Sequence, residues 1–177
     1  MALVVLLPVV ATAGCAPQDQ PGADYPSPDE SEQGMVFYVQ RSLNANTVVY
    51  AARLTAEGRL DPEQPIEAYW RVYERGGRRS QLDWKEQRLA YGVQWEPHQH
   101  AGYRVHIVSR KERQAHLFQD AFGALRLVGL VSGRQAHLSC AYVQLEDDRA
   151  TIPSVRYVDL YGRDLETGDF LHERIRG

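Results

Sequence analysis

The 177-residue sequence lacks the motifs that usually reveal a chemistry. It contains no G-x-S-x-G nucleophile motif, no phosphate-binding loop and no H-E-x-x-H zinc motif. It also lacks a strong charge of either sign, because the formal net charge is -3. We therefore expect no nucleic-acid partner held by phosphate neutralisation. We also expect no cofactor, and a non-catalytic role is favoured over an enzyme.

Lysine is scarce, and acidic residues gather near the start of the chain. Lys85 and Lys111 are the only lysines, so nearly all basic side chains are Arg, which forms planar, bidentate pairs with carboxylates. Residues 16–33 carry five acids and no Lys or Arg. Removing this -5 from the net charge of -3 leaves +2 for residues 34–177. The main body is thus nearly neutral, with an expected salt-bridged surface.

The first apolar run is too short to span a bilayer. Residues 3–10 are apolar, residues 11–14 are small, and Cys15 follows. This pattern suits a signal peptide at residues 1–14, and "ATAGC" resembles the lipobox of bacterial lipoproteins. The resemblance implies that Cys15 is acylated and becomes the mature N-terminus. Ordinary cleavage after Ala13, and retention of the run as a simple anchor, are the alternatives.

The next segment is poor in apolar side chains. Residues 15–34 hold four prolines and five acids, too little apolar surface to drive folding. We interpret them as a disordered, acidic tether that joins a lipid anchor to a folded domain at 35–177. The expected location is therefore the bacterial cell envelope, on its periplasmic or extracellular face, with the membrane as a partner.

The second cysteine lies in an apolar run. Cys140 sits within "AHLSCAYVQL", where a Cys behaves as a small buried hydrophobe. If Cys15 carries lipid, an intramolecular disulfide is ruled out. His137, the nearest His in sequence, falls on the other face of a strand, so a nucleophilic Cys140 is not favoured.

From residue 35 onward the hydrophobic pattern has a period of two. Such alternation, broken by Gly, Pro, Asn and Asp turn signals, predicts short strands. Turns are expected at "NAN", "GGRRS" and "ETGD", among others. We predict a single antiparallel β-sandwich or barrel-like domain of about nine strands. The predicted strands are 35–41, 47–54, 65–73, 89–97, 102–109, 124–131, 135–145, 154–162 and 169–175.

One short helix is expected within this β pattern. Asp83 is a good N-cap for residues 84–89, and Glu86 follows three residues later as its capping-box partner. Residues 114–119 fit either a helix or a strand, and we interpret them as a further strand. Trp70 and Trp95 fall on apolar faces, so both are predicted core residues.

Four separated blocks carry a family resemblance. "VFYVQRSLNANTVVY", "GRLDPEQPIEAYW", "LAYGV" and "YVDLYGRDLETGDFLHERI", in this order, resemble a bacterial family known as domain of unknown function 4833. The resemblance covers about residues 35–175. It implies a single compact domain that is often exported, and it does not indicate any particular activity.

The stretch "QRSLNANTVVY" supplies the candidate ligand-binding residues Arg41, Asn44, Asn46 and Thr47. If they converge at one end of the sheet, they offer a fork of donors and several amides to a polar ligand. The two Asn residues are alternatively turn formers that bond their own backbone. Arg41 could equally pair with a carboxylate such as Glu173 or Asp159.

Histidines and paired acids give weaker indications. His98 and His100 share one face of an extended segment, and His106 could supply a third ligand to zinc or copper. Solvated loop histidines are the alternative that we favour. Asp147–Asp148 and the pair Glu166 and Asp169 could serve acid–base chemistry, but acids at loop tips are usually solvated.

Three classes of function remain open. We favour a lipid-anchored, non-catalytic envelope module that binds a protein, a glycan or a small polar ligand. The alternatives are a hydrolase-type envelope enzyme with a polar site near Arg41 and Asn44, and a purely structural envelope protein. A deep cleft that holds a carboxylate beside a His would favour the enzyme.

Overall fold

The computed structural model describes residues 26–28, 32–42, 44–99, 101–146 and 154–177. These residues form one mainly β domain with eleven strands in a single sheet. The first four strands are β1 (Met35–Arg41), β2 (Thr47–Ala52), β3 (Ile66–Val72) and β4 (Arg78–Gln81). The others are β5 (Val93–Pro97), β6 (Tyr103–Ile107), β7 (Ala115–Gln119), β8 (Leu125–Val131), β9 (Arg134–Leu145), β10 (Val155–Asp164) and β11 (Phe170–Arg176).

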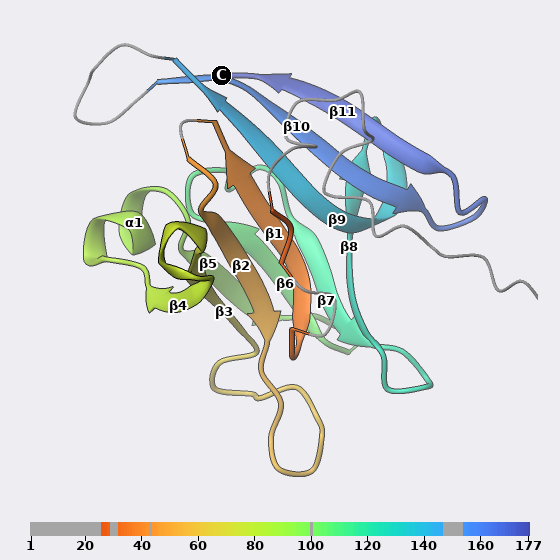
Figure 1. Ribbon diagram of the computed structural model, residues 1–177. Helices are drawn as coiled ribbons and strands as arrows, with labels where there is room; N and C mark the ends of the chain where they lie inside the picture. Colours follow the sequence, from red (N-terminus) through yellow and green to blue (C-terminus); the bar gives the residue numbers. More distant parts are fainter. Residues whose placement is uncertain (1–25, 29–31, 43, 100, 147–153) are drawn as a thin grey trace, which may run out of the picture.

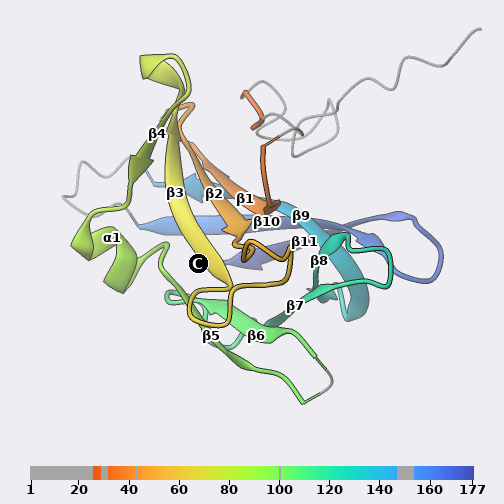
Figure 2. The ribbon, with the colours of Figure 1, turned by 90° about the horizontal axis from the view of Figure 1, so that it is seen from below.

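The sheet divides into two wings that meet at β9 (Figure 1). The strand order is β4-β3-β2-β1-β9-β8-β7-β6-β5, while β10 pairs with the other edge of β9 and β11 pairs with β10. β9 has 12 residues, and it pairs with β8 through its first residues and with β1 further along. Figure 2 shows how the wings diverge. The result is a curled half-barrel.

An apolar core fills the concave side of this half-barrel. Phe37 and Val39 of β1, Val48 of β2, Val105 of β6 and Leu117 of β7 all belong to one buried cluster. Because side chains alternate across a strand, the apolar period of two in each wing places these residues on a shared face. The core therefore holds the two wings together.

The convex side carries a second, more polar cluster. It is rich in tyrosine and consists of Tyr38, Val49, Ala51, Tyr69, Cys140, Tyr142 and Tyr161. Cys140 is fully buried and is not a free thiol, so its sulfur is not exposed for nucleophilic attack. Burial raises the pKa of Tyr161 to about 12, so the phenol is neutral at physiological pH.

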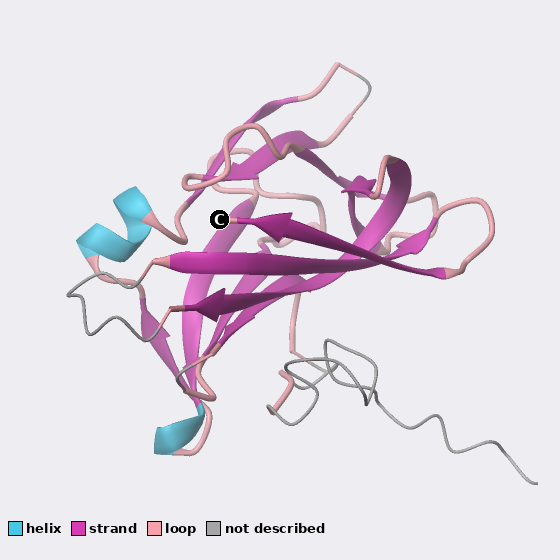
Figure 3. Ribbon diagram, turned by 90° about the horizontal axis from the view of Figure 1, so that it is seen from above, coloured by secondary structure: helices cyan, strands magenta, loops and turns pink. Residues whose placement is uncertain are grey.

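The predicted helix is confirmed, with its capping box. α1 covers Trp84–Leu89, where Asp83 accepts a hydrogen bond from the Glu86 N–H and Glu86 accepts one from the Asp83 N–H. A 3-10 turn, η1, covers Tyr73–Arg75. Figure 3 shows both outside the sheet.

Each of the nine predicted segments, and residues 114–119, contains a strand, although β5 begins at Val93 and not at residue 89, which ends α1. Two larger differences remain. The sequence "GGRRS" predicts a turn, yet Arg78–Gln81 forms β4 against β3. The sheet is mixed, because β1 runs parallel to β9 with Tyr38 opposite Cys140 and Arg41 opposite Val143. A purely antiparallel sheet is therefore a wrong expectation. Alternation identifies strands but does not identify their neighbours.

The two tryptophans that were predicted to lie in the core have different environments. Trp70 is 7% exposed and belongs to the core cluster, as predicted. Trp95 is 36% exposed on β5, so its assignment to the core is wrong. β5 is the last strand of its wing, and a side chain there lacks the neighbour that an inner strand would supply.

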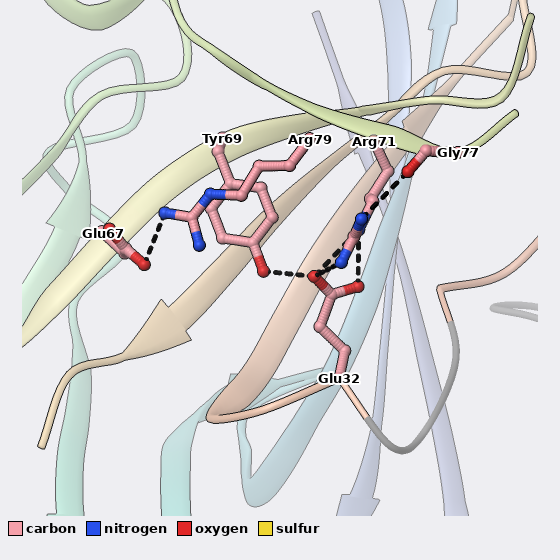
Figure 4. A network of polar contacts seen from close by, with 6 residues as sticks. All are labelled: Glu32, Glu67, Tyr69, Arg71, Gly77 and Arg79. Atoms are coloured by element: carbon pink, nitrogen blue, oxygen red, sulfur yellow. Dashed lines mark hydrogen bonds and ion pairs between the residues drawn. The ribbon is translucent and has the colours of Figure 1, made fainter. Parts of the chain in front are cut away.

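Residues before β1 are anchored to the convex face. Glu32 accepts bidentate hydrogen bonds from Arg71 at 2.5–2.9 Å and a further bond from the Tyr69 hydroxyl (Figure 4). Nearby, the Gln40 amide donates to the Pro26 carbonyl at 3.1 Å. Glu32 therefore acts as part of the folded domain, although the sequence pattern places it in a tether. Among the described residues, no helix is long and apolar enough to cross a membrane.

Candidate functional site

Arg41 ends β1 on the concave side of the half-barrel. It alternates with the core residues Phe37 and Val39, so it shares their face. Its guanidinium carbon lies 4.6 Å from the ring centroid of Trp70, a distance at which a cation is attracted to an indole face. The Trp70 ring is fixed in turn, because its Nε1–H donates to Glu86 at 3.0 Å. Arg41 is thus held on a rigid aromatic surface.

Arg41 has no acidic partner among the described residues. Nine other arginines form ion pairs with carboxylates. The carboxylates proposed for Arg41 are both engaged elsewhere, since Glu173 pairs with Arg113 and Asp159 pairs with Arg174. The Nε of Arg41 is buried and forms no hydrogen bond. A partly buried guanidinium with open donors is a candidate site for an acceptor group.

The Asn pair builds the turn that follows Arg41. The Asn44 side-chain oxygen accepts a hydrogen bond from the Asn46 N–H at 3.1 Å, which is the Asx-turn pattern. The side-chain oxygen of Asn46 is buried and forms no hydrogen bond. A buried acceptor without a donor is costly, so Asn46 adds a second unsatisfied polar group to this end of the sheet.

Thr47 lies on the opposite face of the sheet from Arg41. It alternates with Val48 of the concave core and shares the face of Val49, a member of the convex cluster. Its side chain is fully buried, and its hydroxyl forms no hydrogen bond. The structure therefore brings Arg41 and the Asn turn to one end of the sheet but turns the Thr47 side chain away.

A polar centre on the convex face consists of three residues that the sequence pattern did not group together. Asp159 is fully buried, its carboxylate accepts two hydrogen bonds from Arg174 at 2.7 Å, and His172 Nε2 lies 2.9 Å from it. Burial alone would raise the pKa of Asp159, but the bonds from Arg174 and His172 outweigh it and hold the pKa below its usual range. The alternation of residues 169–175 places His172 and Arg174 on one face, which is the sequence signal for this centre.

The predicted histidine cluster is not assembled among the described residues. The His98 ring packs at a tilt of 39° against His116, with centroids 4.3 Å apart, in a groove of about 450 Å³. His106 instead lies 3.1 Å from the Gln94 amide oxygen, and His100 lies outside the described residues. In the described part of the chain, no three His, Cys, Asp or Glu side chains are grouped to hold a metal ion.

The acid pairs also differ from expectation. Asp147–Asp148 lies outside the described residues. Glu166 is exposed and donates its backbone N–H to the Asp164 carboxylate, while Asp169 accepts a hydrogen bond from the Thr167 hydroxyl at 2.7 Å. These contacts close the β10–β11 turn, so turn formation accounts for both Glu166 and Asp169.

The fold and the site of the described residues define a class: a mainly β domain built on one curled, mixed sheet, with a partly buried Arg at one end. The family model described as Domain of unknown function (DUF4833) matches residues 37–174. The chain belongs to this family. No curated protein and no solved structure matches the chain.

Proposed function

We propose that the chain is an exported, lipid-anchored, non-catalytic binding module of the bacterial cell envelope. In this proposal, Arg41 receives an acceptor group of the ligand, with Asn44 beside it. The observation that carries the proposal is the guanidinium of Arg41, which is stacked on Trp70 and lacks a carboxylate partner among the described residues.

The chemistry favours a ligand that presents oxygen acceptors. Trp70 occupies one face of the Arg41 guanidinium and the Nε atom is buried, so a ligand acceptor would bond to the terminal Nη groups. A carboxylate or phosphate matches such a fork in a bidentate manner, and a hydroxyl-rich glycan matches it less closely. Sources of the acceptor are an envelope protein, a glycan or a small polar molecule.

Variants at Arg41 and Asn44 test this proposal. In a crosslinking pull-down from envelope extract, we expect Arg41→Ala and Asn44→Asp to lose the partner at an unchanged melting temperature. Arg41→Lys should restore binding only in part, because an ammonium cannot reproduce the guanidinium fork. Arg59→Ala is the matched control, since Arg59 is exposed in the loop at the opposite end of β2. Equal loss of partner and stability, or equal binding by all variants, would contradict a binding site.

The proposed lipid anchor predicts that Cys15 is acylated. Labelled palmitate should enter the wild-type protein and should not enter Cys15→Ser. Cys140 is not a free thiol, and one sulfur cannot carry both a thioether and a disulfide. A wild type that takes up no label and whose gel mobility changes on reduction would therefore contradict the anchor.

A second candidate function is a hydrolase-type enzyme. The observation that favours it is the pairing of His172 with the buried carboxylate of Asp159, an arrangement that orients a general base. This pair lies on the convex face, away from Arg41, and it does not line the groove at His98. Chromogenic ester and glycoside substrates test it: turnover that disappears in His172→Gln would establish the enzyme, and absence of turnover in the wild type would remove it.

A further inference from the structure

The strand β5 forms an open edge of the sheet. It pairs with β6 alone. Two hydrogen bonds that flank this pairing show which residues of β5 bond to β6. The Val108 N–H donates to the Gly92 carbonyl at 2.8 Å, and the His98 N–H donates to the Gly102 carbonyl at 3.0 Å. Hydrogen-bonded pairs alternate in an antiparallel ladder. The even-numbered residues of β5 therefore bond to β6.

The odd-numbered residues of β5 point their backbone groups away from β6. The N–H and C=O groups of Val93 and Trp95 face outward, and they form no backbone hydrogen bond with the described residues. Pro97 has no N–H and ends the strand. The open edge thus presents two donors and two acceptors from Val93 and Trp95, the spacing that a neighbouring strand requires.

β5 carries fewer charged side chains than the other two edges of the sheet. β4 carries Arg78 and Arg79 along four exposed residues, and β11 carries His172, Glu173, Arg174 and Arg176. Charged side chains on an edge discourage pairing with another strand. The sequence of β5, "VQWEP", holds one charge, on Glu96, which already pairs with Arg104 at 2.9 Å.

Apolar surface and a hollow accompany this edge. A cavity of about 390 Å³ follows the strand and is lined by Val93, Gln94, Trp95, Glu96 and His106. The hollow therefore lies beside β5, and His106 of β6 contributes to its lining. α1, which leads into β5, exposes 68% of Trp84 and 60% of Leu89, and Trp95 is 36% exposed. Exposed apolar side chains on β5 and on the helix that leads into it favour an interaction surface in this part of the fold.

We propose that β5 pairs in antiparallel fashion with β5 of a second copy of this chain, about a two-fold axis at Gln94. In this register Val93 lies opposite the partner's Trp95, and Trp95 opposite the partner's Val93. All outward backbone groups of both residues then form hydrogen bonds, four in total for the pair of strands, as follows from the alternation of an antiparallel ladder. The edge is self-complementary, which is the requirement for an isologous dimer.

The distribution of charge also favours a second copy of the chain at the β5 edge. In this register Glu96 lies opposite the partner's Gly92, so the two acidic side chains do not face each other. A register centred on Trp95 would place Val93 opposite the partner's Pro97, and the Val93 carbonyl would lack a donor because proline has no N–H. The axis at Gln94 therefore leaves no backbone N–H or C=O of Val93 or Trp95 unpaired. This inference is independent of the Arg41 site and of the lipid anchor.

A single engineered cysteine tests the contact and its register. In the full chain, Gln94→Cys places two sulfurs on a non-hydrogen-bonded pair, where the Cα atoms are about 4.5 Å apart. This separation lies within the disulfide range of about 4.4–6.8 Å. We expect a covalent dimer under mild oxidation. Glu96→Cys is the matched control, since its two copies lie about 13 Å apart along the strands, and the wild type controls for Cys15 and Cys140.

The dissociation constant gives a second readout without oxidation. By sedimentation velocity, Trp95→Lys should weaken self-association by about tenfold or more, because a lysine on the edge opposes strand pairing. A melting temperature close to that of the wild type confirms that the variant folds. A wild type that stays monomeric while Gln94→Cys gives no cross-link would overturn the proposal. So would equal cross-linking of Gln94→Cys and Glu96→Cys, or occupation of β5 by an extended segment of another protein in place of the second copy.

Discussion

Truncation of Trp70 to Ala will lower the free energy of unfolding by about 3–5 kcal/mol, the range for large buried aromatics. Trp70 is 7% exposed and packs edge-on against Tyr91 with centroids 5.3 Å apart. It also donates to Glu86 and carries Arg41 on its ring. Its removal opens a cavity where β3 packs against the residues that precede β5. Chemical denaturation measures the loss directly.

Trp95→Ala provides the control for Trp70→Ala. Trp95 is more exposed and lies on an open strand edge, so we expect a loss of about 1 kcal/mol or less for the monomer. The two substitutions delete the same side chain, and their difference therefore measures burial. Equal losses at both positions would show that the concave core does not centre on Trp70.

Replacement of Arg174 by Ala will lower the free energy of unfolding by about 2–4 kcal/mol at pH 7. The substitution leaves the fully buried carboxylate of Asp159 with only His172 as a partner. Loss of one partner from a buried ion pair costs about 3–5 kcal/mol, and the value is discounted here because the Arg174 side chain is 46% exposed. Arg176→Ala removes an exposed Arg of the same strand that forms no ion pair with the described residues, and it should change stability by about 0.5 kcal/mol or less.

The effect of Arg174→Ala depends on pH with a definite sign. The pKa of Asp159 lies below its usual range in the folded protein, so the ion pair stabilises the fold above the unfolded pKa of about 3.9. This stabilisation is lost as the pH falls through the lower, folded pKa. The difference between wild type and variant should therefore shrink below about pH 4. A difference that is constant from pH 7 to pH 3 would mean that Arg174 acts through packing alone.

Local signals determine which parts of the fold could be predicted. The helix at Trp84–Leu89 follows from its own capping residues, Asp83 and Glu86, and the strands follow from alternation. β4 was missed because its residues "RRSQ" are all exposed, so no apolar alternation marks them. The parallel pairing of β1 with β9 joins segments about 100 residues apart. No local pattern encodes such a pairing.

The candidate site was predictable to a similar extent. The Asn44 turn is a local hydrogen bond and follows from the residue type. The position of Arg41 over Trp70 depends on the packing of β1 beside β2 and β3. Its lack of an acidic partner depends on where every other Arg and carboxylate lies, which only the tertiary structure determines. The centre at Asp159 was missed as a unit for the same reason.

The central claim is that Arg41 is an open site for an acceptor group. The most direct measurement is the set of ¹H–¹⁵N signals of the Arg41 guanidinium, Nη as well as Nε, assigned with Arg41→Lys, during titration with acetate and with inorganic phosphate. These anions represent the carboxylate and phosphate chemistry that a guanidinium fork accepts. We predict a saturable shift of the Arg41 signal, while the Arg59 signal stays in place. No shift at Arg41, or equal and unsaturated shifts at Arg41 and Arg59, would contradict the proposed site.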